Sequence, residues 1–289
     1  MNQQEMTARI AAGDGFIAAL DQSGGSTPKA LRGYGVADEE WSGDDEMFAK
    51  IHEMRCRIIR SPAFTGDKVV GAILFEMTMD GTVDGKPVPQ ALIDKGLEDE
   101  ADGAQLMKPM PGLDALLERA KALGVYGTKE RSVINAANPE GIAAIVAQQF
   151  AVGRQVLAHR MMPILEPEYS IKAPDRAEGE AILREEILEQ LDALPDGQQV
   201  MLKLSLPVEA NLYKPLVEHP KVLKVVALSG GYTRDEACNE LARNDGTIAS
   251  FSRALLDALR APMSDAEFDA ALGEAIDAIH RASTRKVPA

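Results

Sequence analysis

One lysine, Lys203, lies in the middle of a mostly apolar segment that runs from Val200 to Pro207. Aliphatic and β-branched residues that end at a proline are typical of a parallel strand covered on both faces, so we expect Lys203 to be buried. Burial lowers the pKa of an ammonium group toward the range in which the free amine is nucleophilic, which suits Schiff-base chemistry on a carbonyl. The segment alone leaves open a second interpretation, in which the lysine reaches solvent from the strand end or is held in a structural ion pair.

Polar residues also stand at or near the carboxyl ends of the other strands that the apolar pattern predicts. These strands are expected at Phe16–Asp21, Val69–Glu76, Val125–Lys129, Met162–Glu166, Val200–Ser205, Val222–Ser229 and Thr247–Phe251. The polar residues at their ends are Asp21, Glu76, Lys129, Glu166, Lys203 and Ser229, with Arg253 just past the last strand. Helices are expected between the strands, at Asp44–Arg60, Gly112–Leu123, Pro139–Leu157, Asp175–Leu194, Thr233–Arg243 and Ser264–Ala282.

The alternation of strands and helices predicts an α/β fold with a parallel sheet and right-handed crossovers. A doubly wound sheet gathers its functional residues near one switch point, whereas a (β/α)8 TIM barrel draws them from the ends of many strands. The distribution in this chain favours the barrel. No linker divides the sequence, so residues 1–289 are expected to form a single domain. The apolar pattern gives roughly seven strands, and the third strand of a barrel is missing between Glu76 and Val125.

Two glycine-rich loops follow the first strand and the strand at residues 222–229. Glycine lets backbone amides converge on an oxyanion and serine hydroxyls add donors, so each loop could hold a phosphate, although Ser-Gly-Gly is also ordinary turn chemistry. Two such loops at strand ends, with Arg253 beside the second, predict a small sugar substrate that carries two phosphates. The loop residues are Ser23 and Ser26 in the first loop, and Ser229, Gly230 and Gly231 in the second.

Two carboxylates and two basic residues are candidate acids and bases beside these loops. Glu166 and Glu168 fall on one side of their strand by alternation, unless Pro167 turns the chain between them. Lys129 and Arg131 alternate onto one face in the same way. With lysines and carboxylates around one pocket, an amine can be kept neutral while a carboxylate relays protons. A ring of salt bridges that closes the barrel mouth is the structural alternative.

The formal net charge of -14 argues against nucleic acid or an anionic membrane as a partner, so local basic groups must hold any phosphorylated substrate. Two cysteines and the absence of a long apolar segment predict a cytoplasmic protein. The histidines lie in helices, near a helix end or beside a proline, so we predict no metal site and no cofactor. The sequence leaves open whether the chain forms a homo-oligomer.

Five motifs are highly specific in combination: FIAALDQSGGSTPK (residues 16–29), LEPE (165–168), MLK (201–203), LSGG (228–231) and SFSRA (250–254). Together they resemble the class I fructose-1,6-bisphosphate aldolases, and the short bacterial branch of that family most closely. The resemblance covers essentially the whole chain. It implies cleavage of fructose 1,6-bisphosphate to dihydroxyacetone phosphate and glyceraldehyde 3-phosphate through a lysine imine, without a metal.

The resemblance also implies residue roles. Lys203 would be the Schiff-base lysine, Glu166 the general acid/base for carbinolamine dehydration, and Lys129 its electrostatic partner. Asp21 would orient groups around C–C cleavage, and Glu168 would be a supporting charge in the mouth of the site. Ser229, Gly230 and Arg253 are expected at one phosphate and Ser23 and Ser26 at the other, and Gly231, Ser252, Lys29 and Arg131 complete the expected substrate-binding set.

Departures from the family limit this transfer. Ser252 stands before the arginine where animal members have glycine. The family's third strand, which reads like Phe-Leu-Lys-x-Asp-Lys-Gly and supplies a lysine and an aspartate, is absent, so Asp94 and Lys95 are assigned no role. Two alternatives stay open: another imine-forming sugar-phosphate aldolase or transaldolase that shares Lys203, and a phosphosugar-binding barrel with impaired turnover.

We expect the third strand to belong to the protein, because a barrel closes only if every strand has two neighbours. An omitted segment predicts a backbone break between Leu92 and Glu98, with a C–N separation far above the roughly 1.33 Å of a peptide bond. It also predicts an open slot between the second and fourth strands. A deletion between two similar Asp-Lys-Gly stretches would give the same sequence, whereas a continuous chain with an eighth strand from elsewhere would contradict the prediction.

Overall fold

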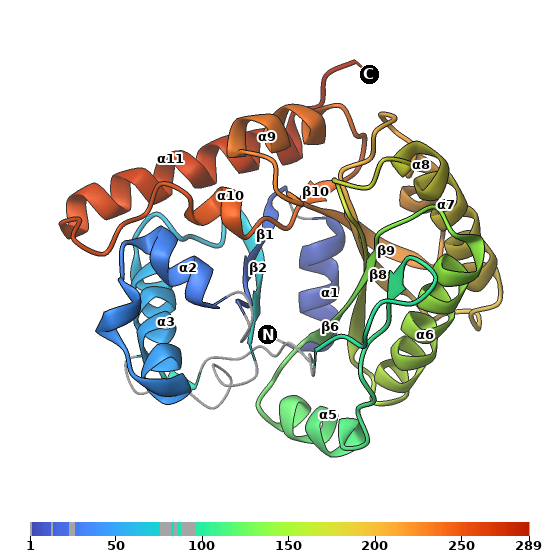
Figure 1. The fold of residues 1–289 in the computed structure, drawn as a ribbon, viewed down its shortest axis with the longest axis horizontal. Coiled ribbons are helices and arrows are strands. Elements are labelled where there is room, and N and C mark those ends of the chain that lie inside the picture. The colour runs from blue at the N-terminus through green and yellow to red at the C-terminus, as the bar shows by residue number, and fades with distance from the viewer. Residues whose placement is uncertain are drawn as a thin grey trace.

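Strands and helices alternate along the chain, and the strands bend around one interior (Figure 1). This computed structural model describes residues 2–12, 14–22, 27–75 and 96–288, and the backbone of residues 82–83 and 86–87. The main strands are β1 (Phe16–Leu20), β2 (Val69–Leu74), β6 (Gly127–Ile134), β7 (Met162–Tyr169), β8 (Val200–Ser205), β9 (Val222–Leu228) and β10 (Ile248–Ala249).

The main strands lie side by side in space, with β2 at one end of the row and β6 at the other. β1 pairs with β2 in parallel, and a larger sheet has the order β10-β9-β8-β7-β6-β5, in which β6 to β10 are parallel. A backbone hydrogen bond from Ala19 N to Phe251 O (3.2 Å) links β1 to the segment that follows β10. This bond places β1 beside β10, so the main strands lie side by side in the order β2-β1-β10-β9-β8-β7-β6.

Helices lie outside the strands, except α1 (Figure 1). The longest ones cover the two halves of the strand layer: α3 and α11 pack beside β1 and β2, and α6 and α7 pack beside β6, β7 and β8. The helices are α1 (Gln3–Ala12), α2 (Thr27–Tyr34), α3 (Gly43–Arg60), α5 (Leu113–Ala122), α6 (Pro139–Ala158), α7 (Arg176–Asp192), α8 (Lys214–Val217), α9 (Arg234–Ala242), α10 (Arg253–Leu256) and α11 (Asp265–Thr284).

One apolar cluster fills the space that the strands enclose. Its buried members come from α1, from the residue before β6 and from six strands, which are β1, β2, β7, β8, β9 and β10. Because one face of each of these strands points to the same cluster, the strands must curve around it, as barrel strands do. The buried side chains are Ile10, Ile17, Ile73, Tyr126, Ile164, Met201, Val226 and Ile248.

Helix α3 illustrates how the sequence builds the outer layer. Met47, Ile51, Met54 and Ile58 recur at spacings of three and four residues, so they form one stripe of the helix, and all four are buried against the strands. Acidic residues occupy the first turn and basic residues the last turn, which favours the helix through its dipole. The same stripe contains Arg55, which no apolar pattern would place there.

Each of the six predicted helices begins and ends within two residues of the observed one. The strand predictions were less accurate at the carboxyl ends, since β6 and β7 continue to Ile134 and Tyr169, whereas β10 is shorter than expected. Two short antiparallel elements were not predicted. β3 (Thr82–Val83) pairs with β4 (Lys86–Pro87) in the stretch where no strand was expected, and β5 (Ala104–Gln105) pairs with the end of β6.

The region of the missing third strand is only partly described. Among the described residues no strand pairs with both β2 and β6: β2 pairs with β1, and the outer edge of β6 pairs with the short antiparallel β5. After residue 95 the chain doubles back on itself, and Leu97 forms an antiparallel bridge with Met107. The predicted break between Leu92 and Glu98 and the residues Glu76, Asp94 and Lys95 lie largely or wholly outside the described residues, so the missing strand stays a prediction.

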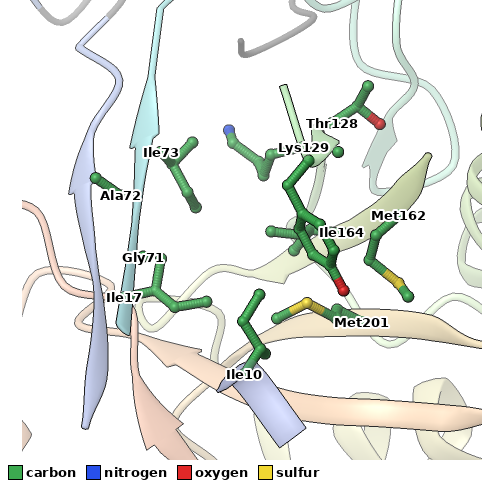
Figure 2. A pocket seen from close by; sticks show the side chains of 12 residues that line it. Ile10, Ile17, Gly71, Ala72, Ile73, Thr128, Lys129, Met162, Ile164 and Met201 are labelled. Carbon is green, nitrogen blue, oxygen red and sulfur yellow. The ribbon is translucent and has the colours of Figure 1, made fainter. Parts of the chain in front are cut away.

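A small cavity lies between β2 and β6, beneath the side chain of Lys129 (Figure 2). Its volume is about 50 Å³, and Ile73 and Ile164 lie on opposite sides of it. Two glycines of the facing strands, Gly71 and Gly127, also line it. Because glycine has no side chain, part of the interior between these two strands is left unfilled.

We predict that Gly71→Ala stabilises the protein by roughly 0.5–1 kcal/mol, because alanine costs less backbone entropy and partly fills the cavity. A Cβ at Gly71 would meet only Ile17, at 3.9 Å. Gly127→Ala is the matched control, since its Cβ would overlap the carbonyl oxygen of Met162 and must destabilise the fold. Urea unfolding of the three proteins measures both effects, and a less stable Gly71→Ala variant would contradict the prediction.

Candidate active site

Two buried lysines and two carboxylates form one ion-pair network inside the mouth of the strand layer. Lys129 Nζ lies 2.7 Å from Glu166 Oε2 and 3.1 Å from Asp21 Oδ2, and Lys203 Nζ lies 3.0 Å from Glu166 Oε1. The four side chains are at most 11% exposed. Buried charges of opposite sign at these distances compensate part of each other's desolvation cost, so the network holds together as a unit.

Strand alternation explains why these four residues meet. Met201 points into the apolar interior, so Lys203 two residues later points to the same side, one layer nearer the carboxyl end of β8. Ile164 and Glu166 are related in the same way on β7. Asp21 follows directly after β1. The charged layer therefore sits on top of the apolar layer, at the carboxyl ends of the parallel strands, where α/β proteins carry their functional residues.

The pKa values follow from this arrangement. Burial by itself raises the pKa of the Asp21 carboxyl, but the charges of Lys129 and Lys203 outweigh it and lower the pKa to about 2. Burial likewise opposes ionisation of Glu166, and the same two lysines lower its pKa below the ordinary value. Both carboxylates are thus ionised at neutral pH, and Glu166 can accept a proton from either lysine.

A cavity of about 510 Å³ opens above the network and collects nearly all the residues that the sequence predicted. A volume of this size fits a small phosphorylated sugar. The predicted residues that line it are Asp21, Lys29, Lys129, Arg131, Glu166, Glu168, Lys203, Ser229, Gly230, Ser252 and Arg253.

Glu168 and Arg131 lie on the same side as Glu166 and Lys129, as alternation predicted. Arg131 Nε donates to Glu168 Oε2 at 2.6 Å, and β7 runs straight through Pro167 instead of turning there. The proline is tolerated because the pairing of β8 with β7 ends at Leu165, so no ladder partner is lost on that side. Lys29 reaches the cavity from α2.

The loop after β9 is a tight turn that depends on the two glycines of the Ser-Gly-Gly motif. Ser229 O accepts hydrogen bonds from Gly231 N (2.6 Å) and Tyr232 N (2.9 Å), and both glycines have positive φ angles, 60° at Gly230 and 133° at Gly231. Gly231 does not line the cavity, but a Cβ built on it would lie 3.8 Å and 3.9 Å from the guanidinium nitrogens of Arg253. The structure therefore brings Arg253 beside this loop, as predicted.

The loop after β1 is described only at its two ends. Ser23 and Ser26 lie outside the described residues, so the structure leaves their predicted phosphate contacts untested. Gln22, which precedes Ser23, is buried, lines the cavity and donates through Nε2 to Ser252 Oγ at 2.8 Å. This contact ties the start of the first loop to the residue before Arg253.

Among the residues that sequence reasoning missed are Gln22 and Ser250, which line the cavity, and Arg55, which lies behind it. Gln22 and Ser250 line the cavity and stand inside motifs that were recognised for their neighbours. Arg55 carries a clearer signal, because an arginine on the apolar stripe of α3 must be buried and therefore needs a specific partner.

Within the part of the chain that the structure describes, no group of three or more His, Cys, Asp or Glu side chains is arranged to hold a metal ion. His159 and His219 instead contact the exposed carboxylates Asp114 and Asp192. No helix among the described residues is long and apolar enough to cross a membrane.

Comparison with known proteins decides the family. No family model matches the chain. A curated protein of Synechocystis, named fructose-bisphosphate aldolase class 1, is 53% identical to it over 291 residues, which cover 97% of each chain. The chain belongs to the class I fructose-bisphosphate aldolase family.

Solved structures agree with this assignment at the level of the fold. The fructose-bisphosphate aldolase of Plasmodium falciparum superposes with a TM-score of 0.80 at 18% identity, covering 99% of this chain and 96% of that one. A crystal structure of a Corynebacterium glutamicum protein superposes with a TM-score of 0.54 at 15% identity, covering 97% and 92% of the two chains. The α/β architecture is thus that of an aldolase.

Glu130 is also a buried carboxyl, but it lies on the opposite face of β6 from Lys129 and outside the ion-pair network. It is 0% exposed, accepts a hydrogen bond from Thr128 Oγ1 at 3.1 Å, and has no hydrogen-bond partner at Oε2 among the described residues. Burial raises its pKa from 4.5 to about 8. Between these two values the folded protein binds this proton more tightly than the unfolded chain, so stability falls as the pH rises.

We predict that Glu130→Gln is more stable than the parent protein, with a difference that grows from pH 5 to pH 8 and reaches on the order of 1–3 kcal/mol. Thermal and urea unfolding at several pH values measure it. Glu53→Gln, at an exposed position on α3, is the control and should show no such trend. A constant difference across the pH range would show that Glu130 is not a buried titrating group.

Arg253 is exposed at the mouth of the cavity and makes little core contact. We predict that Arg253→Ala raises the KM for fructose 1,6-bisphosphate roughly 10- to 100-fold, which corresponds to the roughly 1.5–3 kcal/mol of a hydrogen bond to a charged group. Steady-state kinetics and thermal unfolding check this expectation. A variant that loses stability while its kinetics stay unchanged would make Arg253 a structural residue.

Proposed function

We propose that this chain cleaves fructose 1,6-bisphosphate to dihydroxyacetone phosphate and glyceraldehyde 3-phosphate through an imine on Lys203. The observation that carries the proposal is the buried pairing of Lys203 with Glu166 at 3.0 Å, at the floor of a cavity that also holds basic groups for phosphate. Family membership supports the reaction, and the geometry supports the choice of residues.

Imine formation needs an amine nucleophile and a group that moves protons. Lys203 transfers a proton to Glu166, and its free amine attacks the C2 carbonyl of the open-chain sugar to give a carbinolamine. Glu166 then protonates the departing C2 hydroxyl, which leaves as water. Lys129, 2.7 Å from Glu166, keeps the carboxylate in place and stabilises its charge between the two steps.

The protonated imine next serves as an electron sink. Glu166, a carboxylate again after the dehydration, takes the C4 hydroxyl proton; the C3–C4 bond breaks, glyceraldehyde 3-phosphate leaves as the aldehyde, and the bonding electrons form an enamine on Lys203. Asp21, held 3.1 Å from Lys129, orients the groups around this bond. Protonation of the enamine at C3 and addition of water then release dihydroxyacetone phosphate and restore the amine.

The remaining expectations are proposals of the same kind. Residues 1–289 form a single (β/α)8 barrel, with Ser229, Gly230 and Arg253 at one phosphate and Ser23 and Ser26 at the other. Glu168 and Arg131 shape the mouth between them. The cytoplasmic location and the question of a homo-oligomer stay predictions.

One observation favours a weaker catalyst as the second candidate. Among the described residues no strand pairs with both β2 and β6, since the outer edge of β6 pairs only with the short antiparallel β5. A site without a third strand would lack that strand's lysine, which favours binding of phosphosugars over turnover. Steady cleavage in a coupled assay separates an aldolase from a barrel that only binds phosphosugars. A bisphosphate aldolase should also lose most of its activity on a sugar monophosphate, which separates it from other imine-forming aldolases.

We predict that borohydride in the presence of dihydroxyacetone phosphate labels Lys203 and abolishes activity, because reduction makes the imine permanent. Peptide mass mapping locates the label. Lys203→Met keeps the length and packing of the side chain, so it should fold without activity or label, whereas Lys224→Met on β9 should retain both. Chelators should leave the rate unchanged. Labelling elsewhere or a chelator-sensitive rate would contradict the assignment.

A further inference from the structure

Arg55 is a charged side chain buried behind the site. It lies on the apolar stripe of α3, is 2% exposed and is among the largest fully buried side chains of the protein. Burial lowers the pKa of its guanidinium to about 10, and the charge of Asp21 opposes that shift. Arg55 therefore carries its charge at neutral pH. It directly follows Met54, which lines the cavity.

The contact of Arg55 leads directly to the reacting groups. Its Nη2 donates to the backbone carbonyl oxygen of Gln22 at 2.6 Å, and Thr27 Oγ1 donates to the same oxygen at 3.3 Å. Gln22 follows Asp21 in the chain, and its amide donates to Ser252 Oγ at 2.8 Å. Gln22 thus connects α3, through its carbonyl, with its chain neighbour Asp21 and, through its side chain, with the residue before Arg253.

Stability alone does not explain a cation at this position. Replacing buried charges by apolar side chains of similar volume is often neutral or stabilising, since the desolvation cost disappears with the charge. The stripe of α3 is otherwise apolar and would accept such a residue. What an apolar side chain cannot do is hold the Gln22 carbonyl and, through it, the direction in which the Asp21 side chain leaves the backbone.

We propose that Arg55 is a positioning residue for Asp21: by holding the Gln22 carbonyl it fixes the backbone that follows Asp21, so that C–C cleavage depends on Arg55 and imine formation does not. The inference rests on the proposed function and adds a residue to its machinery. The imine needs Lys203, Glu166 and Lys129. Lys129 also pairs with Asp21, but its shorter contact, at 2.7 Å, is with Glu166, so the three groups stay together when Asp21 shifts.

The test compares two reactions in the same variant. Arg55→Met should lower kcat for fructose 1,6-bisphosphate roughly 100-fold, the usual cost of a small misplacement of a catalytic group. Borohydride trapping of dihydroxyacetone phosphate on Lys203 should stay at the stoichiometry of the parent protein. Arg55→Lys, which keeps a charged donor, should recover part of the cleavage rate without changing the trapping.

Arg57 provides the matched control, because it is also an arginine of α3 with several hydrogen bonds. Its guanidinium contacts the Ala261 and Met263 carbonyl oxygens and lies 4.2 Å from the ring centroid of Phe268. Arg57→Met should therefore lower the thermal stability and leave kcat and trapping unchanged. This variant shows what the loss of a purely structural arginine does to the two reactions.

Parallel loss of cleavage and trapping in a folded Arg55→Met protein, or no loss of either, overturns the inference. If Arg55→Met does not fold, cleavage and trapping are compared in Arg55→Lys instead. Equal losses of the two reactions in that variant overturn the inference. Failure of the parent protein to cleave the bisphosphate or to label Lys203 refutes the proposed function instead, so the two failures are distinguishable.

Discussion

The buried pairing of two lysines with two carboxylates constrains the rest of this protein. Each of these charges would be costly alone in the interior, and removing one partner would leave another charge without compensation. Strands β6, β7 and β8 must therefore keep the register that brings Lys129, Glu166 and Lys203 together, and β1 must place Asp21 within reach of Lys129. The apolar layer below, with Ile10 of α1 at its end, is what keeps these strands at the required curvature.

The same network sets the chemistry. With both carboxylates ionised and both lysines paired, the charges balance, and a proton can move between Lys203 and Glu166 without creating a net charge in the interior. The basic residues around the mouth are less buried and remain available to a phosphorylated substrate, which explains how a chain with a net charge of -14 could bind one. Burial thus separates two roles: the buried ion pairs transfer protons, and the more exposed cations bind the substrate.

Much of this arrangement could be predicted from the sequence. The apolar run around Lys203 predicted a buried strand, and strand alternation predicted that Glu166 and Glu168 share a face; the structure confirms both. The helix boundaries were accurate because hydrophobic periodicity and capping residues such as Ser264 mark them. These are local signals, and they depend only on neighbours along the chain.

Tertiary contacts account for what could not be predicted. β7 continues through Pro167 because β8 no longer pairs there, and β6 extends because β5 pairs with its end. The partner of Arg55 is a backbone carbonyl 33 residues away, which no spacing rule identifies. The contacts of Ser23 and Ser26, like the third strand, lie outside the described residues, so these expectations remain predictions.

A crystal structure of the protein soaked with dihydroxyacetone phosphate tests the central claim most directly. The account predicts a covalent bond between Lys203 Nζ and C2 of the ligand, with Glu166 released from Lys203 and within hydrogen-bonding distance of the former carbonyl position. A ligand bound without a covalent bond, above an intact pair of Lys203 and Glu166, would contradict it.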